Sequence, residues 1–348
     1  MKFYTNQHRY TCGIDLHARS LYVCILDDTG QTVVHKQISA SPEALLRLIT
    51  PYLSDLVMGV ECMFSWYWVA DFCADHQIEF VLGHALYMKA IHGGKAKNDK
   101  IDSEKIARLL KGGMFPMAYV YPRQWRGTRD LMRRRMRLMR QRAELIAHIH
   151  NTISQYNLPP NTDNLRYEKH REPLRQLFAD ASVQRSIDLD LDRIDFYDQQ
   201  LSKLEYYLKK TAKQVDKHAV IRLKSIQGIG DILSLVILYE IHSIDRFERV
   251  QDFVSYCRLV KCKRESAGKS YGTGGAKIGN AYLRWAFGEA AVLFLRGNPK
   301  AQQWVARKTQ QHNKAKALTL LAHKLGRAVF FMLKRHTLFD QDKFLASR

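Results

Sequence analysis

Apolar and polar positions along the first 82 residues alternate in short blocks of strand and helix length. Three apolar blocks joined by tight polar connections predict three consecutive strands. A helix is expected next, because Ser41-Pro42-Glu43 places a capping serine before a proline at the first helical position. The complete series is strand 9–16, strand 21–27, strand 33–38, the helix from Ser41, strand 56–61, helix 66–76 and strand 78–82. This order predicts a mixed α/β sheet flanked by helices.

Two long segments further along the chain predict a different architecture. Residues 123–157 and 184–218 are polar overall, with an apolar stripe that repeats about every seven residues. Leu158-Pro-Pro160 ends the first segment. The pattern predicts a helical hairpin or coiled coil, which could be an intramolecular helix pair or a stalk for oligomerisation.

Residues 219–340 predict a third, mostly helical unit. It opens with Gly228-Ile-Gly230, the pattern of a helix–hairpin–helix turn whose backbone N–H groups approach a phosphate. The alternative is an ordinary tight turn with a capping glycine. A loop at 261–277, with four glycines and five basic residues, is followed by two helical runs, 280–296 and 299–334.

Length and charge narrow the class of protein. The chain has 348 residues, enough for two or three domains, and a formal net charge of +21, which favours a polyanionic partner. Between Lys89 and Asn151, 16 Lys and Arg residues stand against 5 Asp and Glu residues. We therefore expect a nucleic-acid partner rather than a merely solubilising surface or an anionic membrane. The predicted nucleic-acid contacts are Lys95, Lys97, Arg133, Arg134, Arg137, Gly228, Gly230, Lys263, Arg264 and Lys269.

The cysteines and the hydropathy argue against a zinc-binding, a secreted or a membrane-spanning protein. The six cysteines form no C-x-x-C pair, which argues against a zinc site, and several lie in apolar strand patterns, as expected in a reducing compartment. We expect no signal peptide, and no apolar run reaches transmembrane length. A cytoplasmic protein with no membrane partner is expected.

Four carboxylates in the first third of the chain carry the strongest chemical signal. Asp15 lies in a strand pattern, Glu61 ends another, and Asp99 and Asp102 lie at i, i+3 where a basic loop becomes a helix. Separately, each has an ordinary explanation as a turn former or a first-turn helix residue. Together they have the composition of an oxygen-ligand site for Mg²⁺, the ion of phosphoryl transfer.

Ser266 in the glycine-rich basic loop is a candidate nucleophile. A serine hydroxyl needs a base or a metal to become reactive, whereas Lys263, Arg264 and Lys269 could clamp a phosphate beside it. From spacing alone the loop could equally be a flexible phosphate-binding segment, and Ser270 and Thr273 are competing nucleophiles.

Taken in order, these motifs resemble a known family over nearly the whole chain. The matching segments are Gly13-Ile14-Asp15, the strand-end Glu61, Asn98-Asp99-x-x-Asp102-Ser103-x-x-Ile106-Ala107, Ile226-x-Gly228-Ile229-Gly230, Glu265-Ser266-x-Gly268 and Gly279-Asn280-Ala281-x-Leu283-Arg284. They resemble the DEDD transposase family of insertion sequences, bridge-RNA-guided serine recombinases related to the pilin-gene invertase. Cys62-Met63-Phe64 and Arg258-Leu259-Val260-Lys261 depart from the family's usual residues, which leaves the subgroup and local loop geometry open.

The resemblance implies a domain plan and a set of partners. A RuvC-like, ribonuclease-H-like catalytic domain is expected at 1–118, a coiled-coil linker domain at 119–218 and a mostly helical transposase domain at 219–348. The implied partners are donor and target DNA, a noncoding guide RNA from the element, and further copies of the chain as a dimer that assembles into a tetramer. The expected place of action is the nucleoid of a bacterial cell.

The resemblance also implies residue roles. Asp15, Glu61, Asp99 and Asp102 would be a catalytic tetrad holding two Mg²⁺ ions, with Mn²⁺ as a substitute, and Ser266 would become joined covalently to a DNA phosphate. Two other functions remain open. One is a metal-dependent nuclease of the Holliday-junction-resolving kind, with water as nucleophile, and the other is a non-enzymatic RNA- or DNA-binding protein.

Overall fold

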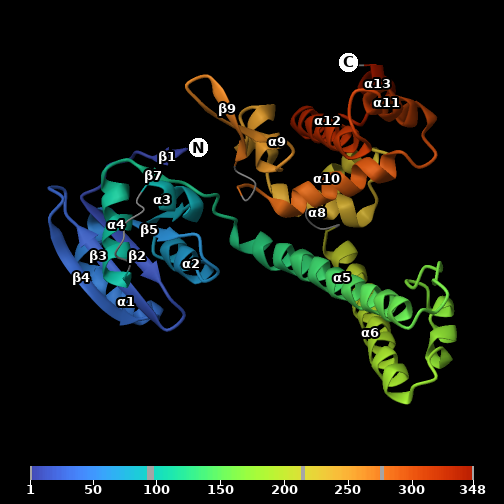
Figure 1. Ribbon diagram of the computed structural model, residues 1–348. Helices are drawn as coiled ribbons and strands as arrows, with labels where there is room; N and C mark the ends of the chain where they lie inside the picture. Colours follow the sequence, from blue (N-terminus) through green and yellow to red (C-terminus); the bar gives the residue numbers. More distant parts are fainter. Residues whose placement is uncertain (1, 92–97, 213–215, 275–277, 347–348) are drawn as a thin grey trace. The chain divides into compact units, whose positions relative to one another are not determined.

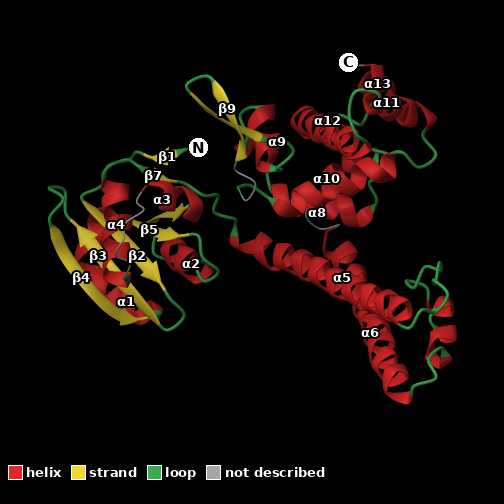
Figure 2. Ribbon diagram, in the orientation of Figure 1, coloured by secondary structure: helices red, strands yellow, loops and turns green. Residues whose placement is uncertain are grey.

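Two compact units, residues 1–124 and 125–348, make up the chain. The computed structural model describes residues 2–91, 98–212, 216–274 and 278–346 (Figure 1). The first unit is built on a mixed α/β sheet and the second is mostly helical (Figure 2).

The first unit contains a five-stranded sheet in the order β4-β3-β2-β5-β6. Strands β2, β3 and β4 form an antiparallel meander, whereas β5 pairs parallel to β2, and β6 parallel to β5. The strands are β2 (Tyr10–Leu16), β3 (Ser20–Leu26), β4 (Thr32–Ser39), β5 (Leu56–Glu61) and β6 (Glu79–Gly83). The mixed sheet predicted from the sequence is confirmed, with strand ends shifted by one residue.

Helices cover both faces of this sheet. One face buries alternate residues such as Ile14 and Met58 against α1 (Pro42–Ile49) and α2 (Tyr67–Asp75). The other face carries α4 (Asp99–Lys111), which lies across β2 and β3 (Figure 1). The predicted cap is confirmed, because the Ser41 side chain accepts a hydrogen bond from the Ala44 N–H. The remaining elements of the unit are β1 (Phe3–Tyr4), η1 (Thr50–Asp55), α3 (Ala85–Ile91) and β7 (Phe115–Pro116).

Two glycines let α4 approach the sheet closely. Gly13 of β2 and Gly59 of β5 are register partners, so they lie side by side. A Cβ on Gly13 would lie 2.3 Å from the Ala107 nitrogen and the Ser103 carbonyl oxygen, both backbone atoms of α4. A Cβ on Gly59 would lie 2.4 Å from the Leu110 side chain. Any larger residue at position 13 would therefore push the helix off the strand.

The second unit begins with a pair of long helices. The helices α5 (Arg123–Gln155) and α6 (Ala181–Ala212) share a hydrophobic cluster that includes Ile149, Ile153 and Leu191. Their ion pairs, Arg135 with Glu205, Arg142 with Asp198 and His148 with Asp190, run in opposite directions along the two helices. The structure therefore pairs the two helices within one chain, antiparallel, which was one of the two open interpretations. Two short helices, η2 (Glu168–His170) and η3 (Glu172–Gln176), lie in the connection.

The rest of the second unit is a helical core with one β-hairpin. The helices are α7 (Lys217–Lys224), α8 (Asp231–Ile241), η4 (Ile244–Arg246), α9 (Val250–Tyr256), α10 (Ala281–Phe294), α11 (Pro299–Thr309), α12 (Lys314–Arg335) and α13 (Gln341–Ala346). They surround one continuous cluster centred on residues such as Phe253 and Phe287.

Three sequence predictions for this region were wrong. The loop predicted at 261–277 contains strands β8 (Cys262–Ser266) and β9 (Lys269–Gly274). The single helix predicted at 299–334 is two helices, because Asn313 caps α12 by accepting from the Lys316 N–H. The helix predicted to continue to 218 ends earlier, and Asp216 caps α7 by accepting from the Ala219 N–H.

A buried carboxylate links three elements of the second unit. Glu240 in α8 is 1% exposed and accepts hydrogen bonds from Arg129 at 3.1 Å, Arg133 at 2.7 Å and the Asn280 amide at 2.7 Å. Burial acts to raise the pKa of Glu240, but the hydrogen bond from Arg133 and the charges of both arginines outweigh it, so the pKa is lowered. This network joins α5, α8 and α10.

We expect Gly13→Ala to destabilise the protein by about 1–3 kcal/mol, because the added methyl group meets backbone atoms that cannot rotate away. The matched control is Gly127→Ala, at a helical position in α5 where an added Cβ meets nothing within 4 Å. That change should stabilise by roughly 0.5–1 kcal/mol. Urea unfolding curves measure the free energy of unfolding of both variants. Equal changes of the same sign would contradict the close approach of α4 to β2.

Glu240→Gln should lower the free energy of unfolding by about 3–5 kcal/mol, because it leaves two arginines without their buried counter-charge. Above the ordinary glutamate pKa, the wild type should exceed the variant in free energy of unfolding by the full amount. This difference should disappear as the pH falls through the lowered pKa of Glu240. Urea unfolding across that pH range measures it. The control is Asp245→Asn, which breaks an exposed pair with Lys334 and should have little effect.

Candidate active site

The strand register brings Asp15 and Glu61 to one edge of the sheet. Both residues alternate with side chains buried under α1 and α2, so both belong to the face that carries α4. Because β2 and β5 are parallel and Ile14 pairs with Val60, the next residue on each strand reaches the same edge. Asp15 and Glu61 are half-buried there.

The start of α4 supplies two more carboxylates at this edge. The Asn98 side chain caps the helix by accepting a hydrogen bond of 2.8 Å from the Ile101 N–H. Asp99 and Asp102 occupy the first turn, where the helix dipole favours negative charge. The contact of Gly13 with Ser103 sets the height of this turn above β2. Asp102 also lies 3.5 Å from the Nζ of Lys105.

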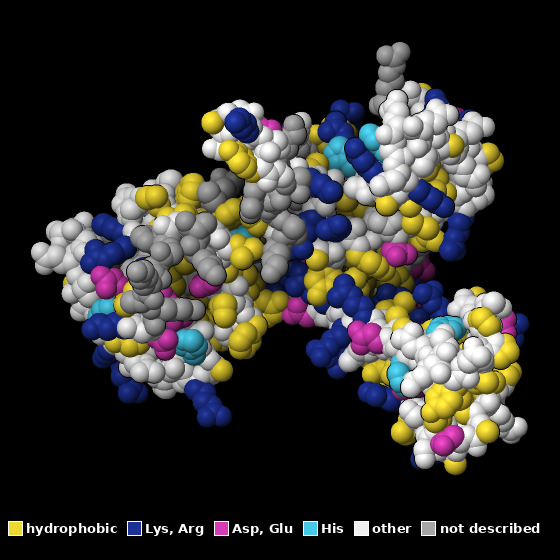
Figure 3. Space-filling model, viewed as in Figure 1, with side chains coloured by type: hydrophobic (Ala, Val, Ile, Leu, Met, Phe, Trp, Pro, Cys, Tyr) yellow, Lys and Arg dark blue, Asp and Glu magenta, His cyan; other side chains and the backbone are white. Residues whose placement is uncertain are grey.

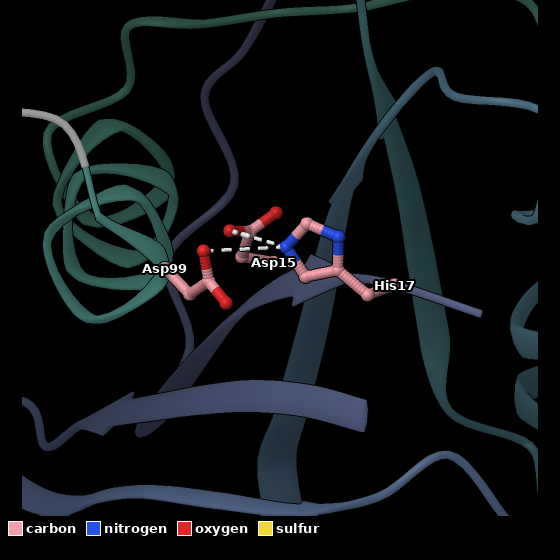
Figure 4. A group of neighbouring side chains, drawn as sticks. All are labelled: Asp15, His17 and Asp99. Atoms are coloured by element: carbon pink, nitrogen blue, oxygen red, sulfur yellow. Dashed lines mark ion pairs between the residues drawn. The ribbon is translucent and has the colours of Figure 1, made fainter. Parts of the chain in front are cut away.

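A histidine that the sequence analysis missed lies between the acids. The Nε2 of His17 is 3.4 Å from Asp15 Oδ2 and 3.3 Å from Asp99 Oδ1 (Figure 4). One ligand atom from each of these three residues lies within 4.8 Å of the other two. The spacing Asp15-x-His17 at a strand end was the available signal, since residues i and i+2 of a strand share a face.

The electrostatics of Asp15 fit a site that holds a cation. Burial raises the pKa of Asp15, the charge of His17 lowers it, and the charges of Asp99 and Asp102 raise it again. The net shift of the pKa is upward, because burial, together with the nearby charges of Asp99 and Asp102, outweighs the effect of His17. A divalent cation would relieve that repulsion, and the carboxylate and imidazole donors are ligands that such ions accept.

The candidate nucleophile belongs to the second unit. Ser266 is the last residue of β8, is exposed and pairs with Lys269 across a two-residue turn. Ala267 and Gly268 have φ values of 49° and 72°, as in a type I′ turn, which demands positive φ at both positions. The hairpin is anchored at its base, since Arg258 donates to the Gly279 carbonyl oxygen at 2.9 Å and the Asn280 N–H donates to Tyr256.

The predicted nucleic-acid contacts differ in their surroundings. Arg134 and Arg137 are exposed on α5, where Figure 3 shows Lys and Arg side chains gathered on the face in view. Arg133 faces Glu240 instead and lies over the Tyr282 ring at 4.6 Å. Lys269 is exposed on the hairpin. Lys95, Lys97 and the side chains of Lys263 and Arg264 lie outside the described residues.

The two glycines of the predicted phosphate turn have different surroundings. Gly228 has a φ of +87°, and an added Cβ would lie 2.7 Å from the Leu293 backbone, so packing against α10 requires glycine. Gly230 caps α8, and an added Cβ there meets nothing within 4 Å. A phosphate contact at this turn stays a prediction.

None of the helices in the described part of the chain has the length and apolar character needed to cross a membrane.

Comparison with known proteins agrees with the motifs. A DEDD-type transposase model named for IS110 matches residues 12–158, and a model described as the transposase IS116/IS110/IS902 family matches residues 221–306. The first segment contains all four acids and the second contains Ser266. The chain is also 21% identical to the transposase for insertion sequence element IS1111A of Coxiella burnetii, over 93% of this chain and 89% of the relative.

The resemblance inferred from the sequence motifs is thereby confirmed. A DEDD domain implies the use of divalent metal ions, and the acids at the sheet edge are chemically suited to it. The chain belongs to the IS110 family of DEDD transposases of insertion sequences, enzymes that cleave and rejoin DNA.

Proposed function

We propose that this transposase cuts and rejoins DNA by a serine nucleophile, Ser266, at a phosphate held by magnesium ions on a RuvC-like domain, under the guidance of a noncoding RNA from its own element. The observation that carries the proposal is the convergence of Asp15 and Asp99 at one sheet edge, with Asp102 and Glu61 placed at the same edge.

The proposed roles follow from donor chemistry. Asp15, Glu61, Asp99 and Asp102 would hold two Mg²⁺ ions, with Mn²⁺ as a substitute. Bound there, the ions would supply charge stabilisation for the attacking and leaving oxygens of an in-line displacement. Through the ions that they hold, the acids would also orient the scissile phosphate.

The serine step can be written with its atoms balanced. The Oγ of Ser266 forms a bond to phosphorus, the bond from phosphorus to the departing strand breaks, and the hydroxyl proton ends on the departing oxygen. The resulting phosphoserine ester conserves the energy of the phosphodiester. A hydroxyl end of another strand then attacks the same phosphorus, which rejoins the DNA and returns the proton to Ser266.

The hairpin favours Ser266 over the other hydroxyls of this segment. Ser266 is exposed and lies directly beside the turn, whereas Ser270 pairs with Glu265 one step further from it. Lys269 is the register partner of Ser266, so a cationic side chain is available near the attacked phosphate. A tight turn also limits the positions that the hydroxyl can adopt.

The partners are proposed from charge and from the demands of strand exchange. Exposed arginines such as Arg134 and Arg137 are suited to binding the phosphate backbone of nucleic acids. Such charge contacts do not depend on the base sequence. Exchange between two duplexes needs several active sites, so we propose a dimer that assembles into a tetramer on the bacterial nucleoid. The proposed domains are 1–118, 119–218 and 219–348.

A metal-dependent nuclease of the junction-resolving kind is the second candidate. It is favoured by one observation, that the acids and Ser266 belong to separately packed units. Such an enzyme would need the acids but would use water as nucleophile. The two candidates differ in whether a covalent protein–DNA adduct forms.

The wild-type enzyme, incubated with Mg²⁺, guide RNA and element-end DNA, should form an adduct that survives denaturing electrophoresis. Ser266→Ala should reduce this adduct to background while leaving DNA binding unchanged. Ser270→Ala is the matched control and should retain it. Cleavage by Ser266→Ala at the wild-type rate would establish water as the nucleophile.

Asp15→Asn should reduce strand cleavage by more than about 100-fold, because the neutral amide is a poor ligand for a hard divalent cation. Asp28→Asn, which removes an exposed acid of the same unit, should retain full activity. Single-turnover cleavage assays with the complete protein measure both. Cleavage by Asp15→Asn at the wild-type rate would overturn the metal role of Asp15, and a wild type that binds DNA without cleaving it would support a purely nucleic-acid-binding protein.

A further inference from the structure

We propose that His17 is a metal ligand, which binds through Nε2 the cation shared by Asp15 and Asp99, so that the centre is a mixed nitrogen and oxygen site. This inference rests on the metal role proposed above and extends it to a residue outside the four acids.

The distances from His17 to the two carboxylates are those of neighbouring ligands around one ion, and all three donor atoms lie within 4.8 Å of one another. Donors at about 2.1 Å from a divalent metal lie roughly 3.0–3.4 Å from one another in octahedral or tetrahedral geometry. The Nε2 of His17 lies 3.4 Å from Asp15 Oδ2 and 3.3 Å from Asp99 Oδ1. Figure 4 shows the ring nitrogen directed between the two carboxylates.

Two other histidine–carboxylate contacts among the described residues are shorter. The Nδ1 of His8 lies 2.6 Å from Asp55, and the Nδ1 of His148 lies 2.5 Å from Asp190. Each of these is a tight contact of one ring nitrogen with one acid. A third contact, of His8 Nε2 with Glu79 at 3.3 Å, is longer but also joins one ring nitrogen to one acid. The His17 nitrogen stands nearly equidistant from two acids, at distances longer than an ordinary hydrogen bond. That arrangement leaves room for an ion among the three donors.

Independent parts of the fold hold the donors in place. His17 follows β2 directly, and its backbone N–H donates to the Ser20 carbonyl oxygen at 3.0 Å, which fixes the turn. Asp99 is the first residue of α4, and the Asn98 cap fixes the start of that helix. The donors are therefore positioned by backbone hydrogen bonds and helix packing before any ion arrives.

An imidazole ligand changes which ion the site prefers. Carboxylates alone suit Mg²⁺, whereas an imidazole nitrogen favours Mn²⁺ and the later transition ions over Mg²⁺. We therefore expect the site to bind Mn²⁺ more tightly than Mg²⁺, and this preference to depend on His17.

The experiment uses the full-length protein loaded with Mn²⁺ and examined by pulsed electron paramagnetic resonance. The wild type should show coupling of Mn²⁺ to an imidazole ¹⁴N nucleus. His17→Gln, which keeps a polar side chain but removes the imidazole, should lose that coupling. Its affinity for Mn²⁺ should fall by at least about tenfold, with a smaller change for Mg²⁺. His218→Ala is the control for an exposed histidine in the other unit and should retain the coupling.

The outcomes separate this inference from the function on which it rests. The wild type could bind Mn²⁺ without ¹⁴N coupling, and Asp15→Asn could lose that binding. This pair of results would overturn the role of His17 and leave the acid site intact. Coupling that persists in His17→Gln would also overturn it. A wild type that binds no Mn²⁺ would overturn both proposals together.

Discussion

The close packing of α4 on the glycine pair of β2 and β5 is the constraint on which the metal-binding edge depends. Gly13 and Gly59 lie side by side in the sheet, so the helix backbone comes almost into contact with the strand backbone. Only at that distance can first-turn residues of the helix reach a side chain at the end of β2. Two glycines without functional groups thereby determine where Asp99 and Asp102 are held relative to Asp15.

The pKa values of two acids that lie away from solvent, Glu240 and Asp15, are shifted in opposite directions. Glu240 is surrounded by Arg129, Arg133 and the Asn280 amide, so its pKa falls despite burial, and its charge serves to join helices. Burial and the charges of Asp99 and Asp102 raise the pKa of Asp15, against the lowering effect of His17. A carboxylate whose charge is already neutralised by arginines has little to offer a cation. The acid with the unfavourable surroundings is therefore the one suited to binding a metal.

Much of the first unit could be predicted from the sequence, because strand alternation, tight turns and the Ser41-Pro42 cap are local signals. The four acids could be identified by residue type and by their position at strand ends and at a helix start. Parallel strands have their C-terminal ends at the same edge of a sheet. His17 was missed because its partner Asp99 lies 82 positions away, and only the helix packing joins them. The hairpin at Ser266 was taken for a loop, because its glycines and lysines have low strand propensity and tertiary context decides their pairing.

The two halves of the proposed active site differ in how firmly each is held. The acids stand on a sheet covered on both faces, with α4 fixed by backbone contact. Ser266 stands on a two-stranded hairpin whose residues 265–272 are exposed, and such a hairpin is only marginally stable without a supporting sheet. Asn280, which follows the hairpin in the chain, donates a hydrogen bond to the buried Glu240. A rigid phosphate site and a separately carried nucleophile would let the enzyme bind DNA without cutting it, because cleavage would begin only when the assembled complex brings the hydroxyl to the bound phosphate.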